Sequence, residues 1–189
     1  GIDAFVHCFE ALCAPGYHPM ADGIALEGMR LIADALPKAF ANGDDLQARA
    51  DMLAAASMGA TAFQKGLGGV HALAHPIGAV YNAHHGLTNA ILFPYVMVAN
   101  GDAISDRMML LGRTLGLPDA SYKGVLKWVL DFRESMDIPH DLAAIGIPAD
   151  RADDIGMMAL NDPTAGGNPV ALTAGKYSEI FLKAVHGNL

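Results

Sequence analysis

The sequence predicts an all-α fold, and three features of the chain indicate it. Apolar residues recur at the three- and four-residue spacing of an amphipathic helix, and no segment alternates with the period of a β-strand. Proline and glycine interrupt this pattern at intervals that suit helix connections. The composition, 52% hydrophobic and 17% charged, is typical of an ordered globular protein. Because the chain has no repeat and no long linker, residues 1–189 are predicted to form one compact multi-helix domain.

The first three predicted helices are delimited by helix-breaking residues and caps. Helical periodicity begins at the first residues and stops at Pro15-Gly16. A second helix covers residues 19–36, where Pro37 breaks or kinks it before Asn42-Gly43 closes it. The third is rich in alanine and runs from Asp44 to about Gln64, with acidic residues at its start that favour a helix N-terminus.

The remaining helices follow a glycine-rich segment at residues 66–69. The fourth passes through His71 to about Val80, and the fifth runs from near His85 toward Met97 with a bend at Pro94. Later helices are predicted at residues 102–115, 119–136, 149–160 and 173–186, with Pro118, Pro139 and Pro148 marking the connections.

Charge and hydropathy exclude two classes of partner. The net charge is −8, and no basic run is present, so nucleic acid is not an expected ligand. The longest apolar stretch, residues 90–99, is about half of the roughly 20 residues that span a bilayer, and Pro94 interrupts it. A membrane partner is therefore not expected either.

The two cysteines and the start of the chain suggest where the protein resides and how complete it is. Cys8 and Cys13 lie on different faces of one predicted helix, so we expect both to be reduced and buried, in a cytoplasmic protein with no visible signal peptide. The chain opens at Gly1 without an initiator methionine and without a cap ahead of the helical pattern. We therefore expect a fragment of a larger protein.

Several histidines and one aspartate have the spacing of metal ligands. Asp3 and His7 lie one turn apart on one helix, His71 and His75 repeat this spacing on another, and His85 begins the next. Imidazole nitrogens with one carboxylate suit Fe(II), Zn(II) and other borderline divalent ions, and such a set can leave a coordination position open for substrate. Taken singly, an Asp/His pair is more often a surface hydrogen bond. The density of histidines in residues 70–86, among residues suited to a core, favours a metal site.

Three segments of the chain resemble the iron-containing alcohol dehydrogenase family. Residues 70–86, VHALAHPIGAVYNAHHG, resemble the family segment VHxxAHxxGxxYNxxHG, and Asn89-Ala90 and Pro94 match the NAxLxP that follows it. Residues 1–10 resemble GxDAxxHxxE, and residues 168–173 look like the family's NPxxLT passage. The segments occur in the family's order, so the resemblance spans the whole chain.

The resemblance implies a fold, a ligand set and an activity. The fold would be the dehydroquinate synthase-like C-terminal helical domain, and the family's N-terminal NAD(P)-binding domain would be absent from this chain. The metal ligands would be Asp3, His7, His71 and His85, with His75 as a catalytic residue that relays a proton or contacts the substrate. The implied cofactors are Fe(II), with Zn(II) or another divalent ion able to replace it, and NAD(P) bound by the missing domain. The implied reaction is reversible hydride transfer between a small alcohol or aldehyde and NAD(P), with this fragment inactive alone and compatible with a homo-oligomer.

The sequence departs from the family at two positions. Many relatives have Cys where Thr164 stands and Arg where Val170 stands, which puts a local ion pair in doubt but affects no expected ligand. Glu10 matches the family and is expected on a helix surface or behind a ligand. His84 is expected at the rim of the site without a catalytic role.

The remaining histidines, Trp128 and the methionines are expected to have structural and not catalytic roles. His18 is expected to cap or flank the second helix, His140 and His186 are expected to be solvated, and Trp128 and the methionines are expected in the core. The glycines of residues 66–69 could face a phosphate, but close helix packing explains them equally well.

Two other functions are compatible with the sequence. One is another enzyme of the same superfamily, such as a glycerol dehydrogenase or a dehydroquinate synthase-like lyase. The other is a non-enzymatic helical metal-binding module.

Overall fold

The computed structural model describes residues 1–189, which form nine α-helices and four short 3-10 turns without any β-strand. The all-α prediction is therefore confirmed. The helices are α1 (Ile2–Cys13), α2 (Pro19–Ala41), α3 (Leu46–Ala62), α4 (Gly69–Tyr81), α5 (His85–Asn100), α6 (Ser105–Thr114), α7 (Tyr122–Glu134), α8 (Ala152–Leu160) and α9 (Ala174–His186). The 3-10 turns are Phe63–Lys65, Gly101–Ile104, Ala143–Ile145 and Ala165–Gly167.

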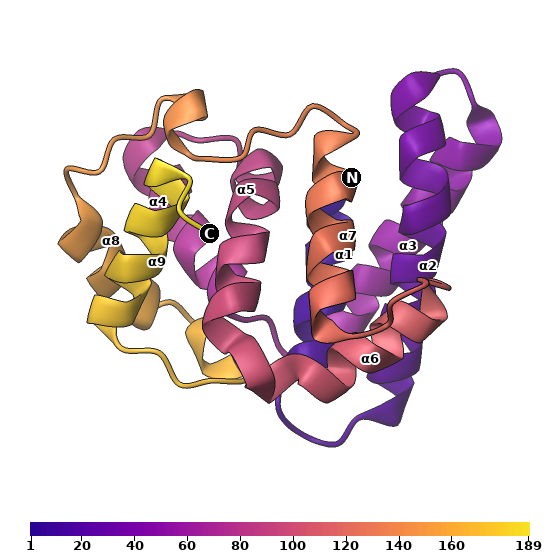
Figure 1. Cartoon of the computed structure of the whole chain (residues 1–189), viewed down its shortest axis with the longest axis horizontal. Coiled ribbons are helices and arrows are strands. Elements are labelled where there is room, and N and C mark those ends of the chain that lie inside the picture. The colour runs from indigo at the N-terminus through magenta and orange to yellow at the C-terminus, as the bar shows by residue number, and fades with distance from the viewer.

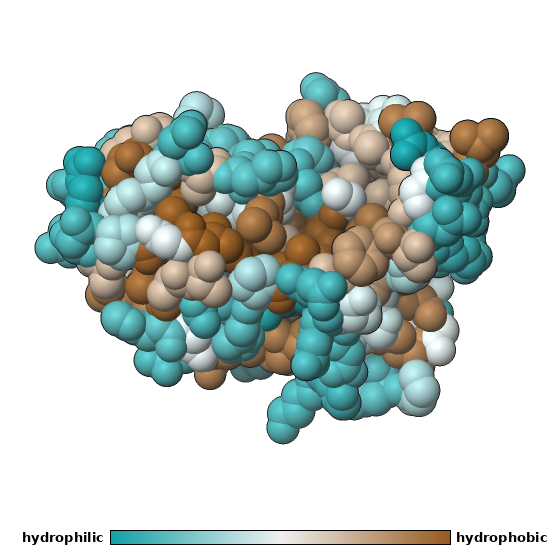
Figure 2. All heavy atoms as spheres, turned by 90° about the horizontal axis from the view of Figure 1, so that it is seen from above, coloured by the Kyte–Doolittle hydropathy of each residue, from teal (hydrophilic) through white to brown (hydrophobic).

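The helices form two groups joined through α1 and α5. The antiparallel hairpin of α2 and α3 stands at one end of the molecule, and α4, α8 and α9 form the other end (Figure 1). Helix α1 packs against α2, α3 and α5, while α4 packs against α5 and α8. The face seen from above exposes apolar atoms in its middle, between two more polar ends (Figure 2).

Helix α1 is buried on almost every side. Ten of its twelve residues are buried, and the two that remain partly exposed are Asp3 and His7. Its phenylalanines meet the neighbouring helices, with the Phe9 and Phe93 ring centroids 4.6 Å apart and those of Phe5 and Trp128 5.6 Å apart. The only polar face left on α1 is therefore the one that carries the expected ligands.

Most predicted helices occur close to their expected ranges, with a few corrections. Helix α2 continues through Pro37 to Ala41, because its packing along α3 compensates for the one backbone hydrogen bond that a proline removes. Helix α3 starts two residues later than expected, with Asp45 as its N-cap accepting a hydrogen bond from the Ala48 backbone N–H at 3.0 Å. The 3-10 turns were not predicted, since short turns leave no periodic pattern.

The expected burial of single residues is confirmed in part. Cys8 and Cys13 are buried free thiols, and burial raises the pKa of Cys8 to about 12. His18 caps α2 through a hydrogen bond from the Ala21 backbone N–H, as predicted. Trp128 packs partly buried against the core, and His186 is exposed.

The expectation that all the methionines lie in the core was wrong. Met20 is 71% exposed and Met157 54% exposed, because the apolar pattern of their helices is wider than the face that is covered. His140 is exposed, as expected, and its ring also has protein partners: Nδ1 is 3.1 Å from the Arg133 guanidinium and Nε2 is 3.2 Å from the Gly187 carbonyl oxygen. No helix combines the length and apolar character needed to cross a membrane.

Arg133 satisfies the backbone carbonyl that Pro94 leaves without a donor in α5. Pro94 has no N–H, so the carbonyl of Ala90, four residues earlier, loses its helical donor. The buried Arg133 side chain reaches across from α7 and donates from Nη1 to the carbonyl oxygens of Ala90 at 3.3 Å and Ile91 at 3.0 Å. Burial lowers the pKa of Arg133.

Replacing Arg133 with Met should lower the free energy of unfolding by about 1–3 kcal/mol, the usual cost of leaving buried polar groups unpaired. The exposed Arg113 makes no side-chain hydrogen bond, so Arg113→Met is the matched control and should change stability by less than about 0.5 kcal/mol. Chemical denaturation of both variants measures the difference. Equal stabilities would show that Arg133 does not support α5.

Candidate metal centre

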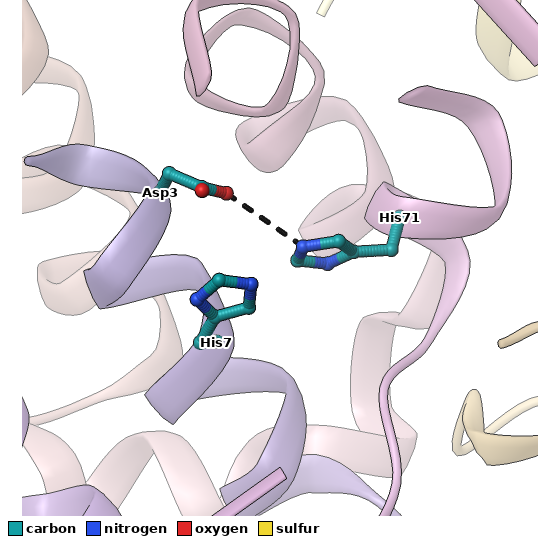
Figure 3. A group of neighbouring side chains, drawn as sticks. All are labelled: Asp3, His7 and His71. Carbon is teal, nitrogen blue, oxygen red and sulfur yellow. Dashed lines mark ion pairs between the residues drawn. The ribbon is translucent and has the colours of Figure 1, made fainter. Parts of the chain in front are cut away.

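The site begins with three polar residues on one face of α1. Asp3, His7 and Glu10 follow one another at spacings of four and three residues, so their side chains project from the same face. Asp3 and His7 point toward His71, which comes from α4 (Figure 3). Asp3, His7 and His71 each offer one nitrogen or oxygen atom that lies within 4.8 Å of those of the other two.

The fourth expected ligand, His85, adjoins this cluster at the start of α5. Its Nε2 is 3.7 Å from Oδ1 of Asp3, and the Nε2 of His71 is 3.6 Å from the same oxygen. The rings of His7 and His71 are stacked with centroids 4.7 Å apart, while those of His71 and His85 are 5.4 Å apart. Segments from three helices thus converge on one small volume.

Glu10 holds α4 and His71 in place from behind. Its Oε2 is 2.7 Å from Nδ1 of His71, and its Oε1 accepts a hydrogen bond from the Val70 backbone N–H, also at 2.7 Å. A carboxylate is favoured at a helix N-terminus, where the backbone N–H groups lack partners. With Nδ1 of His71 bonded to Glu10, Nε2 faces Asp3 and is the atom available to a cation.

The N-terminus of α4 is capped by side chains distant in sequence. The N-cap residue, Gly68, has no side chain, and the Gly69 backbone N–H instead donates to Oδ1 of Asn168 at 3.0 Å. A Cβ at Gly68 would lie 3.1 Å from both this oxygen and Oε1 of Glu10. Close approach of these two side chains therefore explains the glycine, and the phosphate alternative finds no support here.

The pKa values of the cluster are shifted by burial and by the carboxylates of Asp3 and Glu10. Burial opposes ionisation of Asp3, but hydrogen bonds with His71 and Asn89 and the nearby His7 ring hold its pKa well below the ordinary value. Burial lowers the pKa of both His7 and His85, which keeps their lone pairs free near neutral pH. Burial also disfavours the charged form of His71, yet its contacts with Asp3 and Glu10 prevail and raise its pKa to about 9.

His75 lies one turn beyond His71 and is held by a carboxylate. Its Nδ1 is 2.9 Å from Oδ2 of Asp162, and its ring stacks on that of His85 with centroids 5.6 Å apart. Thr164 donates to Oδ1 of Asp162 from its backbone N–H at 2.9 Å and from its hydroxyl at 2.6 Å. Hydrogen bonds to Thr164 and His75 outweigh burial and lower the pKa of Asp162.

The donor set fits a borderline divalent ion. Three imidazoles and one carboxylate of low pKa match the ligands of Fe(II) and Zn(II) sites. A cavity of about 530 Å³ reaches Asp3 and His7 and is otherwise lined mainly by apolar residues of α2 and α3. The arrangement can therefore hold a cation beside space for a small apolar molecule.

Comparison with known proteins identifies the family of this chain. The profile of the Fe-containing alcohol dehydrogenase family, C-terminal, matches residues 1–185. The chain belongs to the iron-containing alcohol dehydrogenase family.

Individual relatives of this iron-containing alcohol dehydrogenase chain cover it almost completely. It is 37% identical to 4-hydroxybutyrate dehydrogenase of Cupriavidus necator, over 96% of this chain and 49% of that protein. It is 33% identical to alcohol dehydrogenase 4 of Saccharomyces cerevisiae, over 97% of this chain and 49% of that protein. Its fold matches a crystal structure of 1,3-propanediol oxidoreductase with a TM-score of 0.92 at 31% identity, over 96% of this chain and 49% of that one. The chain spans about half the length of these relatives.

Two residues in and beside the cluster, Asn89 and Asp162, had no role assigned from the sequence. Asn89 follows His85 by one helical turn, a spacing that could have placed it in the cluster. Glu10, expected on a helix surface or behind a ligand, is buried and lies behind His71. Asp162 lies 87 residues from His75, so no spacing could have paired them. His84, expected at the rim, caps α5 by accepting a hydrogen bond from the Leu87 backbone N–H at 3.2 Å.

Replacing Glu10 with Gln should weaken divalent-cation binding by about 10- to 100-fold, the usual effect of losing a partner behind a metal ligand. The amide oxygen can still accept from Val70, but the NH₂ group would then donate to Nδ1 of His71 and move the ring proton to Nε2. Calorimetric titration with Co(II) measures the affinity. Glu134→Gln, at an exposed position of α7, is the control, and equal affinities of the two variants would contradict this role of Glu10.

Proposed function

We propose that this chain is the cation-binding half of an NAD(P)-dependent alcohol dehydrogenase. The observation that carries the proposal is the convergence of Asp3, His7 and His71, with His85 beside them, on one volume. Fe(II) is the proposed ion because of the family, and the same donor atoms also accept Zn(II). The proposed substrates are small primary alcohols and the corresponding aldehydes, as the names of the relatives suggest.

The chemistry divides between the ion and the residues of this chain. A bound divalent ion would supply Lewis acidity toward the oxygen of an alcohol or carbonyl group. Asp3, His7, His71 and His85 would hold that ion, and Glu10 would keep the Nε2 lone pair of His71 directed at it. The apolar wall of the adjoining cavity would exclude water from the carbon chain of the substrate.

His75 is proposed to carry the hydroxyl proton of the substrate. Asp162 engages its Nδ1, so a neutral His75 keeps its acceptor lone pair on Nε2. The ring lies beside His85 at the exposed margin of the cluster, where a substrate hydroxyl group and solvent can both reach it. A histidine held in one tautomer at such a place is suited to general acid–base catalysis.

The nicotinamide must reach this cluster from outside the nine helices. The described residues contain no strand, glycine-rich turn and helix of the kind that binds a dinucleotide. We propose that NAD(P) is bound by a nucleotide-binding domain that accompanies this chain, in keeping with relatives of about twice its length.

Replacing His71 or His85 with Ala should abolish stoichiometric binding of Fe(II) or Zn(II), because either substitution removes one of the four donors of the cluster. His186→Ala is the control, since His186 is exposed and distant from the cluster in sequence. Metal content after dialysis, measured by mass spectrometry, gives the result. Full metal retention in both variants would contradict the proposed ligand set.

The activity itself is tested on the longest natural protein that contains this chain. Loaded with Fe(II) or Zn(II), it should reduce NAD or NADP with simple primary alcohols and diols. His75→Gln should keep the metal and lower kcat by about 10²- to 10⁴-fold, the usual contribution of a positioned acid or base. A metal-loaded protein that reduces neither nucleotide with any alcohol would contradict the proposal.

A further inference from the structure

Asn89 lies at the centre of the cluster and makes contacts that nothing so far explains. Its side chain comes from α5 one turn after His85 and is completely buried. Its amide nitrogen is 2.7 Å from Oδ1 of Asp3, 2.9 Å from Nε2 of His85 and 3.3 Å from Nε2 of His71. One nitrogen atom therefore touches three of the four proposed donor residues.

These contacts differ from those of an ordinary buried amide. A side-chain NH₂ group has two hydrogens, so it cannot satisfy three acceptors together. Its Oδ1 is buried and has no hydrogen-bond partner, although a buried carbonyl oxygen normally has one. A residue selected only for packing would not leave one end of its amide unpaired and the other end shared among three acceptors.

The acceptors that share this nitrogen are the atoms that would bind a cation. Nδ1 of His71 is already bonded to Glu10, and Oδ2 of Asp3 makes no hydrogen bond, while Oδ1 accepts from Asn89. Without the amide, only the contacts of Oδ1 of Asp3 with the Nε2 atoms of His71 and His85, at 3.6 and 3.7 Å, would hold these three atoms together. The NH₂ group lies within 3.3 Å of all three, and its partial positive charge draws the donors together.

We propose that Asn89 is a positioning residue of the cation site, which arranges Asp3, His71 and His85 around a common point before the cation binds. The amide fixes Oδ1 of Asp3 and thereby orients the whole carboxylate. Because the donors are already gathered, the cation does not have to immobilise them, and its affinity rises accordingly. This inference rests on the proposed function, since it concerns the same cluster.

Replacing Asn89 with Ala should raise the Kd for Co(II) by about 10- to 100-fold and change the Co(II) absorption spectrum, because the donors lose their common orientation. Thr88→Val is the matched control. Thr88 is the neighbouring residue in α5, fully buried, and its hydroxyl donates only to the His84 carbonyl oxygen at 3.0 Å. This control should lower thermal stability without altering the spectrum.

The titration separates this inference from the proposed function. A wild-type protein that binds no Co(II) would overturn the cation site itself. Stoichiometric wild-type binding with the same Kd and spectrum in Asn89→Ala would overturn the role of Asn89 alone.

A second measurement does not depend on a variant that folds. In wild-type protein labelled with ¹⁵N-asparagine, one equivalent of Zn(II) should shift the side-chain NH₂ resonances of Asn89, because its acceptors become ligands. The exposed Asn42, at the tip of the α2–α3 hairpin, is the internal reference and should not move. Bound zinc with unshifted Asn89 resonances would overturn the inference.

Discussion

The interaction on which the site depends is the buried carboxylate of Glu10. A carboxylate that is only 4% exposed is stable when its oxygens are hydrogen-bonded, and both bonds here go to neighbouring residues of α4. One bond holds the backbone at the start of that helix, and the other holds the His71 ring. Sliding α1 by one residue would turn its polar face by about 100° and break both bonds at once. The packing of α1 against α4 and the orientation of the ligand are therefore fixed by the same group.

The rest of the site is supported by buried polar residues that join distant segments. Asn168 and Asn100 exchange hydrogen bonds at 2.7 and 3.1 Å, and Asn168 also caps α4. Arg133 supports α5 where Pro94 interrupts its hydrogen bonding. Asn168 and Arg133 each satisfy a backbone group that glycine or proline has left unpaired, and Asn100 holds the Asn168 side chain. Side chains from the second half of the chain thereby stabilise the helices on which the proposed ligands lie.

The sequence predicts the bounds of a helix and the residues on one of its faces better than it predicts contacts between helices. Periodicity defined the helices, and the spacing of Asp3 and His7 placed both on one face, because these features depend on local geometry. The histidines of α4 and α5 were linked to that face by resemblance alone. The pairing of Asp162 with His75 depends on how the 3-10 turn before α9 returns to α4, which no local pattern encodes.

The exposed fraction of the side chains rises across the cluster, from His71 to His75 and His85. The side chain of His71 is 2% exposed and backed by Glu10, Asp3 is 26% exposed, and His75 and His85 are 42% and 43% exposed. Structural metal sites in proteins are closed on all sides, whereas catalytic sites keep one position open. A cation held here would be covered on the side of Glu10 and accessible on the side of His75. That asymmetry favours catalysis over metal storage and places the proposed proton carrier at the exposed margin of the cluster.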